Sequence, residues 1–226
     1  MKRWMTALLA CLLMAAALPA LAQDSLVVTE EMIYSKPEEN FYKVAGIIVN
    51  QGEEAIDISF VRVELKDEAG ETLENTSNVV IPGHLAPGEI AYFAGSFMDI
   101  SEDTLAAVAS HTVTIEQEAY GVLVALPTVV ITPLDQIDEE KGIVAEYTNN
   151  TGKPLKRVRV VWILRDESGK LIDLITFLTN FMEPLAKGAQ SESGYPFGWM
   201  TPTLAECLDM GLANGSAQCL VFAIQE

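Results

Sequence analysis

The segment Val63-Glu64-Leu65-Lys66-Asp67-Glu68-Ala69-Gly70 decides the fold, and its pattern returns later as Trp162-Ile163-Leu164-Arg165-Asp166-Glu167-Ser168-Gly169. In the first copy apolar residues alternate with charged residues, which is the period of a strand with one face in water. Asp67–Gly70 then predicts a tight hairpin turn, because Gly70 suits a positive φ. The pattern therefore predicts a central β-strand and its turn, present twice in the chain.

Two further landmarks repeat at nearly the same spacing. Val44–Asn50 returns as Ile143–Asn149, at the same offset of 99 residues as the central strand. Leu85–Gly88 returns as Leu185–Gly188 at an offset of 100. A period of this length exceeds the 20–50 residues of solenoid repeats and is the size of a small domain. We therefore expect two copies of one fold, at residues 23–126 and 127–226.

The remaining patterns around each central strand indicate an all-β fold. Short helices are expected at Ser101–Val108 and after Thr203, where Thr203 and Glu206 form a capping box. Short segments with turns between them predict an antiparallel β-sandwich in each copy, with a short helix before the last strand. The expected strands are Leu26–Tyr34, Tyr42–Asn50, Val61–Leu65, Asn78–Ile81, Ile90–Phe97, Thr112–Gln117, Thr128–Thr132, Val158–Leu164 and Cys219–Ile224.

The first 22 residues predict a secretory signal peptide. Lys2 and Arg3 precede the apolar run Trp4–Leu18, and Pro19–Ala22 places small residues where a signal peptidase cuts. Cleavage after Ala22 predicts a secreted or cell-envelope protein with no transmembrane segment in the mature chain. The segment that ends in Cys11 resembles a lipoprotein cleavage box. Cys11 lies in the middle of the apolar run, however, which disfavours a lipid anchor.

The charge excludes one class of partner. The formal charge of the chain is −18, and removing Lys2 and Arg3 makes it −20. Such a surface repels phosphate backbones, so nucleic acid is not expected to bind.

The mature chain contains two cysteines, Cys207 and Cys219. In an exported protein these residues could form a disulfide, and two buried free thiols are the alternative. Neither His84 nor His111 has a ligand-like spacing from them, so no metal site is predicted.

The repeated segments resemble the FxLYD family of extracytoplasmic bacterial domains. The signature pentapeptide corresponds to Val63–Asp67 and Trp162–Asp166, although the aromatic is lost in one copy and the tyrosine in both. The upstream glycine-to-asparagine segment of the family corresponds to Gly46–Asn50 and to Ala145–Asn149, where alanine replaces the glycine. The resemblance covers the middle half of each copy and implies two tandem immunoglobulin-like sandwiches that act as interaction or spacer modules. It implies no shared active site.

An aromatic cluster suggests a second possibility. Tyr195, Phe197 and Trp199 alternate across Pro196 and Gly198, which would place three rings on one strand face. Exposed rings at Tyr195 and Trp199 could stack on sugars. The competing interpretation places them in the core, because Phe197 aligns with Phe97 in the repeat.

A comparison of the two central strands predicts an interface. At the offset of 99, Arg62 aligns with Val161 and Glu64 with Ile163, on the face opposite Val63 and Trp162. Exposing both apolar side chains would forgo about 1.5–3 kcal/mol of burial free energy each. The sister domain, a second molecule or another protein is expected to cover them, and a half-exposed surface pair is the alternative.

No catalytic constellation is evident. The two histidines, His84 and His111, are isolated, and the sequence pattern around them gives no sign of a catalytic triad. The acidic segments, Glu38–Glu39 and Asp138–Glu140, match no known calcium loop. We therefore expect no enzyme and no cofactor, but a non-catalytic protein-interaction or scaffold module. A carbohydrate- or small-ligand-binding accessory protein that uses Tyr195, Phe197 and Trp199 is the alternative.

Overall fold

The computed structural model describes residues 25–117, 123–126, 129–131, 137, 142–198 and 200–224. Most of these residues form antiparallel strands, which confirms the all-β class. The predicted signal peptide, Cys11, Trp199 and the predicted boundary at 126/127 lie wholly or partly outside the described residues.

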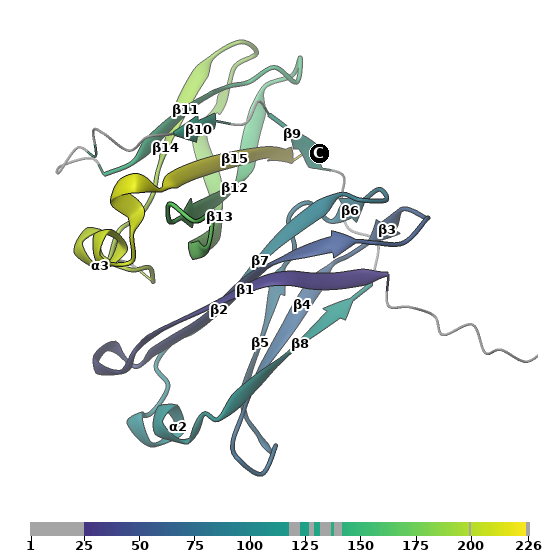
Figure 1. Cartoon of the computed structure of the whole chain (residues 1–226). Helices are drawn as coiled ribbons and strands as arrows, with labels where there is room; N and C mark the ends of the chain where they lie inside the picture. The colour runs from purple at the N-terminus through teal and green to yellow at the C-terminus, as the bar shows by residue number, and fades with distance from the viewer. Residues whose placement is uncertain are drawn as a thin grey trace, which may run out of the picture.

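The strands form two groups, which we call the N-half and the C-half (Figure 1). The N-half contains a sheet of order β1-β2-β7, a sheet of order β5-β4-β8 and the short pair β3-β6. Its elements are β1 (Leu26–Lys36), the 3-10 helix η2 (Pro37–Glu39), β2 (Phe41–Asn50), β3 (Ile56–Asp57), β4 (Phe60–Lys66), β5 (Thr72–Val79), β6 (His84–Leu85), β7 (Ile90–Phe97), α2 (Glu102–Ala107) and β8 (Ser110–Glu116).

The C-half is built around a sheet of order β10-β15-β12-β13, with β9 also paired to β15 and with β11-β14 as a separate pair. Its elements are β9 (Leu123–Ala125), β10 (Val129–Ile131), β11 (Val144–Thr148), β12 (Leu155–Arg165), β13 (Leu171–Leu185), β14 (Gln190–Gly194), α3 (Leu204–Asp209), the 3-10 helix η3 (Leu212–Asn214) and β15 (Ser216–Ile224).

Each half has its own apolar core, and the alternating residues of the central strand supply part of it. Val61, Val63 and Leu65 of β4 point into the N-half core. In β12, Trp162 and Leu164 belong to the C-half core. Opposite faces of a strand receive alternate side chains, so Arg62 and Glu64 of β4, and Val161 and Ile163 of β12, point away from these cores.

The strand registers repeat at the offset that the sequence predicts. Leu65 pairs with Glu74 in the N-half, and Leu164 pairs with Asp173 in the C-half. One step further along, both pairs of strands carry a register shift, so the bulge also recurs. Gly70 and Gly169 have φ values of 82° and 84° in the corresponding turns, a conformation that favours glycine.

The halves differ in their first strands. In the N-half β1 pairs with β2, whereas in the C-half β9 and β10 both pair with β15. The strands β12 and β13 are also continuous where the N-half has the separate pairs β3-β6 and β4-β5.

Two local predictions need correction. A strand was predicted at Asn78–Ile81, but β5 spans Thr72–Val79 and ends before the peptide Ile81–Pro82, which is cis. The predicted strand with Tyr195 and Phe197 on one face is wrong, because β14 ends at Gly194. Pro196 has no N–H to donate to a sheet, and Gly198 turns the chain at a φ of 79°.

Candidate functional site

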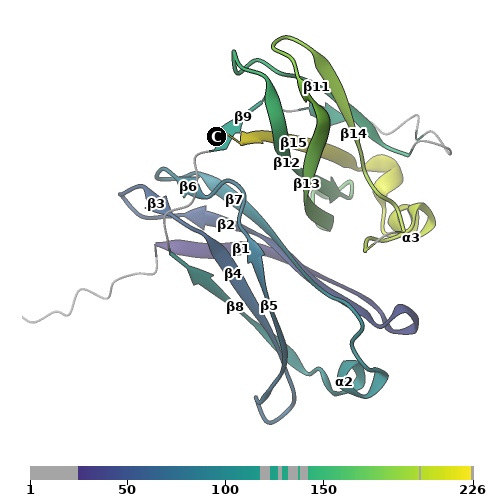
Figure 2. The same cartoon turned by 180° about the vertical axis from the view of Figure 1, so that it is seen from behind.

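The β1-β2-β7 sheet of the N-half lies against the β12/β13/β15 face of the C-half (Figures 1 and 2). A continuous apolar layer lies between them. Val161 and Ile163 lie in this layer and are 0% and 2% exposed. The N-half covers these two residues of β12, the interface pair that the repeat comparison selected. The other buried members of the layer are Met32, Ala45, Ile47, Ile81, Tyr92, Leu171, Leu174, Leu220 and Phe222.

The corresponding face of the N-half is polar. Val161 of β12 pairs with Leu220 of β15, and the aligned residue Arg62 of β4 pairs with Thr114 of β8. In the same way, Ile163 and Leu174 align with Glu64 and Asn75, and Phe222 aligns with Glu116. Two sheet faces that align in register therefore differ: the face in the C-half is apolar and covered by the N-half, and the face of β5-β4-β8 in the N-half is charged.

A fully buried ion pair joins the halves beside this layer. Lys43 of β2 shares a strand face with Ala45 and Ile47, so its side chain points toward the C-half. Its Nζ lies 2.5 Å from Oδ1 of Asp173 on β13, and both side chains are 0% exposed. Burial lowers the pKa of Lys43, while the carboxylate of Asp173 opposes that shift.

The second carboxyl oxygen of Asp173 has a different partner. The Tyr195 hydroxyl donates a hydrogen bond to Oδ2 of Asp173. Burial, and then the neighbouring Asp173 carboxylate, raise the pKa of Tyr195 well above its ordinary value, so this phenol stays protonated. The ring of Tyr195 packs edge-on against Trp162, with 6.2 Å between ring centroids. The core of the C-half thus fixes the carboxyl group that meets Lys43.

Lys43 has two further neighbours. Its Nζ donates to the backbone carbonyl of Met200 at 3.2 Å and lies 5.6 Å from the centre of the Tyr34 ring. The Tyr34 hydroxyl donates to Oε2 of Glu206 at 3.1 Å. Because Glu206 also completes the capping box with Thr203, α3 takes part in the contact between the halves.

A second ion pair between the halves involves Arg165, the last residue of β12. The guanidinium of Arg165 bonds both carboxylate oxygens of Glu30 on β1, at 2.5 and 3.0 Å. Two-pronged contacts of this kind fix orientation as well as distance. Both side chains keep partial contact with solvent, so the pair adds orientation more than stability.

Cys207 and Cys219 are free thiols, and both are buried in the C-half core. Burial raises the pKa of each thiol to about 12, which keeps both in the poorly reactive protonated form.

Tyr195 is 3% exposed and Phe197 packs partly buried against the same core. The two rings contact each other, with centroids 4.6 Å apart at 65°. The face of Tyr195 is therefore not available for stacking on a sugar ring.

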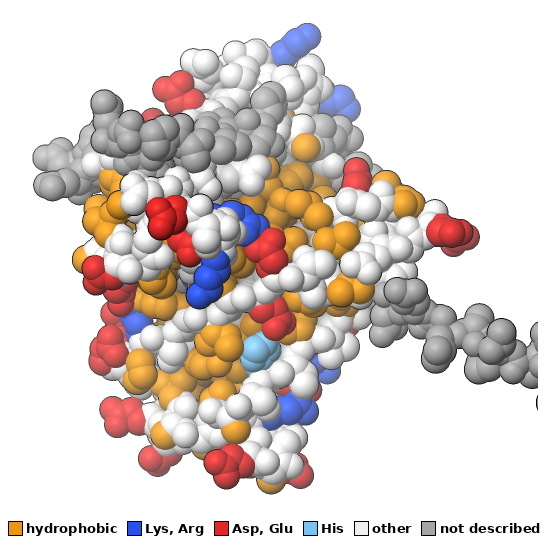
Figure 3. Space-filling view, in the orientation of Figure 1, with side chains coloured by type: hydrophobic (Ala, Val, Ile, Leu, Met, Phe, Trp, Pro, Cys, Tyr) orange, Lys and Arg blue, Asp and Glu red, His pale blue; other side chains and the backbone are white. Residues whose placement is uncertain are grey.

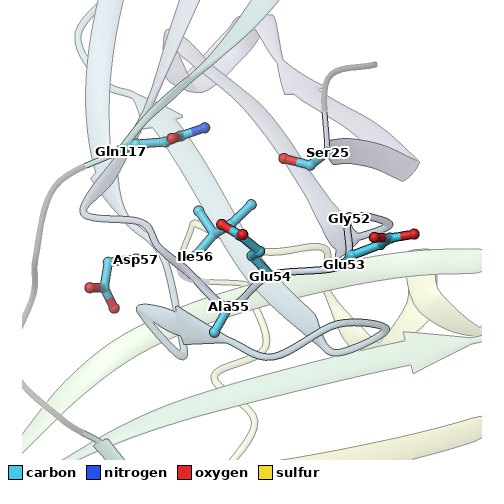
Figure 4. Close-up of a pocket in the computed structure, with 8 residues that line it drawn as sticks. All are labelled: Ser25, Gly52, Glu53, Glu54, Ala55, Ile56, Asp57 and Gln117. Atoms are coloured by element: carbon cyan, nitrogen blue, oxygen red, sulfur yellow. The ribbon is translucent and has the colours of Figure 1, made fainter. Parts of the chain in front are cut away.

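The surface hollow in Figure 4 has a volume of about 580 Å³ and lies beside the β2–β3 turn. It is lined by Ser25, Gly52, Glu53, Glu54, Ala55, Ile56, Asp57 and Gln117. The carboxylates of Glu53 and Asp57 point in different directions, and Asp57 contacts Nδ1 of His84 at 2.7 Å. These groups do not converge on a common point. Within the described parts of the chain, no three His, Cys, Asp or Glu side chains are grouped to hold a metal ion.

Sequence reasoning did not find Lys43 and Asp173. The available signal was the position of Lys43 between the aromatic residues Phe41 and Tyr42 and the apolar run Val44–Val49. Asp173 aligns with Glu74, which is exposed, so the repeat alone gives no reason to expect a buried carboxylate. The pair exists only because the halves pack together.

Comparison with protein-family models and with curated proteins gives no match for this chain. None of the helices in the described residues is long and apolar enough to cross a membrane.

Proposed function

We propose that this protein is a non-catalytic secreted or cell-envelope scaffold, made of two tandem immunoglobulin-like sandwiches that present a binding surface to another protein. The proposal rests on a difference between two equivalent sheet faces, one apolar and covered, the other charged. The apolar face of the C-half is occupied by the N-half. The equivalent face of β5-β4-β8 is left for an external partner.

The chemistry of that free face suits a reversible protein contact. Arg62 pairs with Glu116 at 2.9 Å, and Thr112 donates to Glu64 at 3.2 Å. Charged and hydroxyl groups on a regular sheet give orientation and specificity without a large apolar area. Figure 3 shows acidic side chains scattered over the face that it draws, both at its outline and near its centre.

The interface between the halves supports a stiff scaffold. An apolar layer, a buried ion pair and the two-pronged Arg165–Glu30 contact act together. A large apolar contact between domains limits their relative motion, so the free face is held at a fixed angle to the C-half.

The signal-like first 22 residues and the resemblance to the FxLYD family support export and an interaction role. The carbohydrate alternative depends on exposed Tyr195 and Trp199, and Tyr195 is buried. No observation favours that alternative.

Site-specific photo-crosslinking in the source cells tests the proposal. A photoreactive residue at Glu64 should give one discrete protein adduct, because this position lies on the free sheet face. The same residue at Met182, which is 97% exposed on β13, serves as the matched control and should give none. Absence of an adduct at Glu64, or the same adduct from both positions, would overturn the assignment.

A further inference from the structure

We propose that Lys43 and Asp173 are joined by an intramolecular amide bond between Nζ and Cγ, which links the two halves covalently. The proposal stands independently of the scaffold function, because a covalent link between the halves would be equally compatible with another role.

The contact between the two residues is not an ordinary hydrogen-bonded ion pair. Nζ and Oδ1 are 2.5 Å apart. Even so, Oδ1 has no hydrogen-bond partner among the described residues, so the contact lacks the angles of a hydrogen bond. The amine of Lys43 and the carboxyl group of Asp173, which can condense to an amide, are therefore in contact in a geometry that does not suit a hydrogen bond.

The surroundings favour neutral reactants. Both side chains are shielded from solvent, and a dry site disfavours the separated charges of an ammonium and a carboxylate. Transfer of one proton from Nζ to the carboxyl group produces a neutral amine and a carboxylic acid. Burial lowers the pKa of Lys43, which agrees with this direction of transfer.

The reaction balances without any other reagent. The lone pair of the amine attacks Cγ, and the C–Oδ1 bond breaks. Oδ1 leaves as water with one proton from the acid and one from the amine. The nitrogen keeps one proton, the ion pair and the amide have the same net charge, and nothing is oxidised or reduced.

Each remaining polar atom of the product already has a partner. Oδ2 becomes the amide carbonyl and accepts the hydrogen bond from Tyr195. That hydrogen bond also stabilises the negative charge that develops on Oδ2 during attack, as an oxyanion-hole donor does. The amide N–H can donate to the Met200 carbonyl, which accepts from Nζ at 3.2 Å. Oδ1, the atom without a hydrogen-bond partner, is the one that leaves.

Mass spectrometry of the purified full-length product tests the bond directly. Under denaturing and reducing conditions, with the N-terminus determined by sequencing, the protein should be lighter than its sequence by one water molecule. Trypsin should fail to cut after Lys43, and fragmentation should identify a branched peptide that joins Lys43 to Asp173. A full sequence mass, or a loss that maps to other residues, would overturn the proposal.

Variants separate the reacting pair from its neighbours. Lys43→Arg keeps a cation and Asp173→Ala removes the carboxyl group, and both should restore the full mass. Lys36→Arg changes a nearby buried lysine that pairs with Glu39 and should keep the loss of one water. Tyr195→Phe should leave part of the molecules unlinked, and complete linkage in that variant would overturn the role of the Tyr195 hydroxyl. The mass of the unmodified protein decides the question even if a variant fails to fold.

Discussion

Asn50 and Asn149 show at the level of single residues how the repeat is preserved. The side-chain amide of Asn50 donates to the carbonyls of Glu54 and Leu85, at 2.8 and 3.0 Å. Asn149 makes the equivalent bonds to Lys153 and Leu185, at 2.7 and 2.9 Å. Each asparagine therefore ties a turn to a distant strand segment, which no apolar residue of similar size could do.

Replacing either asparagine with alanine should lower the free energy of unfolding by about 1–3 kcal/mol, since buried carbonyls lose their donors. Urea denaturation of Asn50→Ala and Asn149→Ala measures the two costs. The costs should be similar because the bonds are equivalent. A large loss in only one variant would contradict the equivalence of the two turns.

The buried thiols predict a pH dependence of stability. Burial raises the pKa of Cys207 and Cys219 from 9.0 to about 12, so the folded state binds protons that the unfolded state releases. Their stabilising contribution is complete below pH 9 and is lost as the pH rises toward 12. By pH 10 the loss is about 1.4 kcal/mol for each thiol.

Urea unfolding at pH 8 and pH 10 tests this prediction. The double variant Cys207→Ala/Cys219→Ala is the control, since it retains every other titrating group and should lose less stability between the two pH values. Thiol titration of the denatured, non-reduced protein should give two groups. Equal pH slopes, or no titratable thiols, would refute the assignment of two buried free thiols.

At the level of elements, the capping box at the start of α3 also contributes to the contact between the halves. Thr203 accepts from the backbone of Glu206, and Glu206 in turn accepts from the backbone of Thr203. In α2 the cap is one-sided, with Ser101 accepting from Thr104. The reciprocal cap also orients Glu206 toward Tyr34 of β1.

Thr203→Ala should therefore destabilise the protein by about 1 kcal/mol, within the usual 0.5–2 kcal/mol for a lost cap. Ser101→Ala provides the matched change in an exposed cap and should cost less, because α2 takes no part in the contact between the halves. Chemical denaturation compares the two variants. A greater loss from Ser101→Ala would show that the cap of α3 has no additional role.

Much of the element order can be predicted from the sequence, and particular residues show where the prediction ends. Strand β7 has its predicted bounds, and Ser101 and Thr203 cap the two predicted helices. These features depend on nearby residues. The alternation of Tyr195 and Phe197 resembled a strand, but Pro196 and Gly198 impose a turn there. The Lys43–Asp173 contact could not be predicted, because it depends on how two separate sheets pack.

At the level of the whole molecule, the face formed by Val161 and Ile163 controls the relation between the halves. Their side chains are buried against residues of β1, β2 and β7. In the N-half the aligned positions hold Arg62 and Glu64 in contact with solvent. The aligned strand β4 therefore accommodates charge at these positions, where solvent reaches the side chains.

The double variant Val161→Arg/Ile163→Glu transfers the N-half residues to the C-half. Each lost burial should weaken the contact between the halves by about 1.5–3 kcal/mol, and the new charges add a desolvation cost. Both cores should persist, because Trp162 and Leu164 point the other way. We expect thermal unfolding to change from one transition to two, together with increased binding of a dye that detects exposed apolar surface.

The matched control is Arg62→Ala/Glu64→Ala, which alters the aligned and exposed positions of the N-half. It should leave a single unfolding transition and unchanged dye binding, because it touches neither core nor the layer between the halves. If the Val161/Ile163 double variant behaved like this control, the apolar layer would not be what holds the halves together. Orientation would then depend on the contacts of Lys43 with Asp173 and of Arg165 with Glu30.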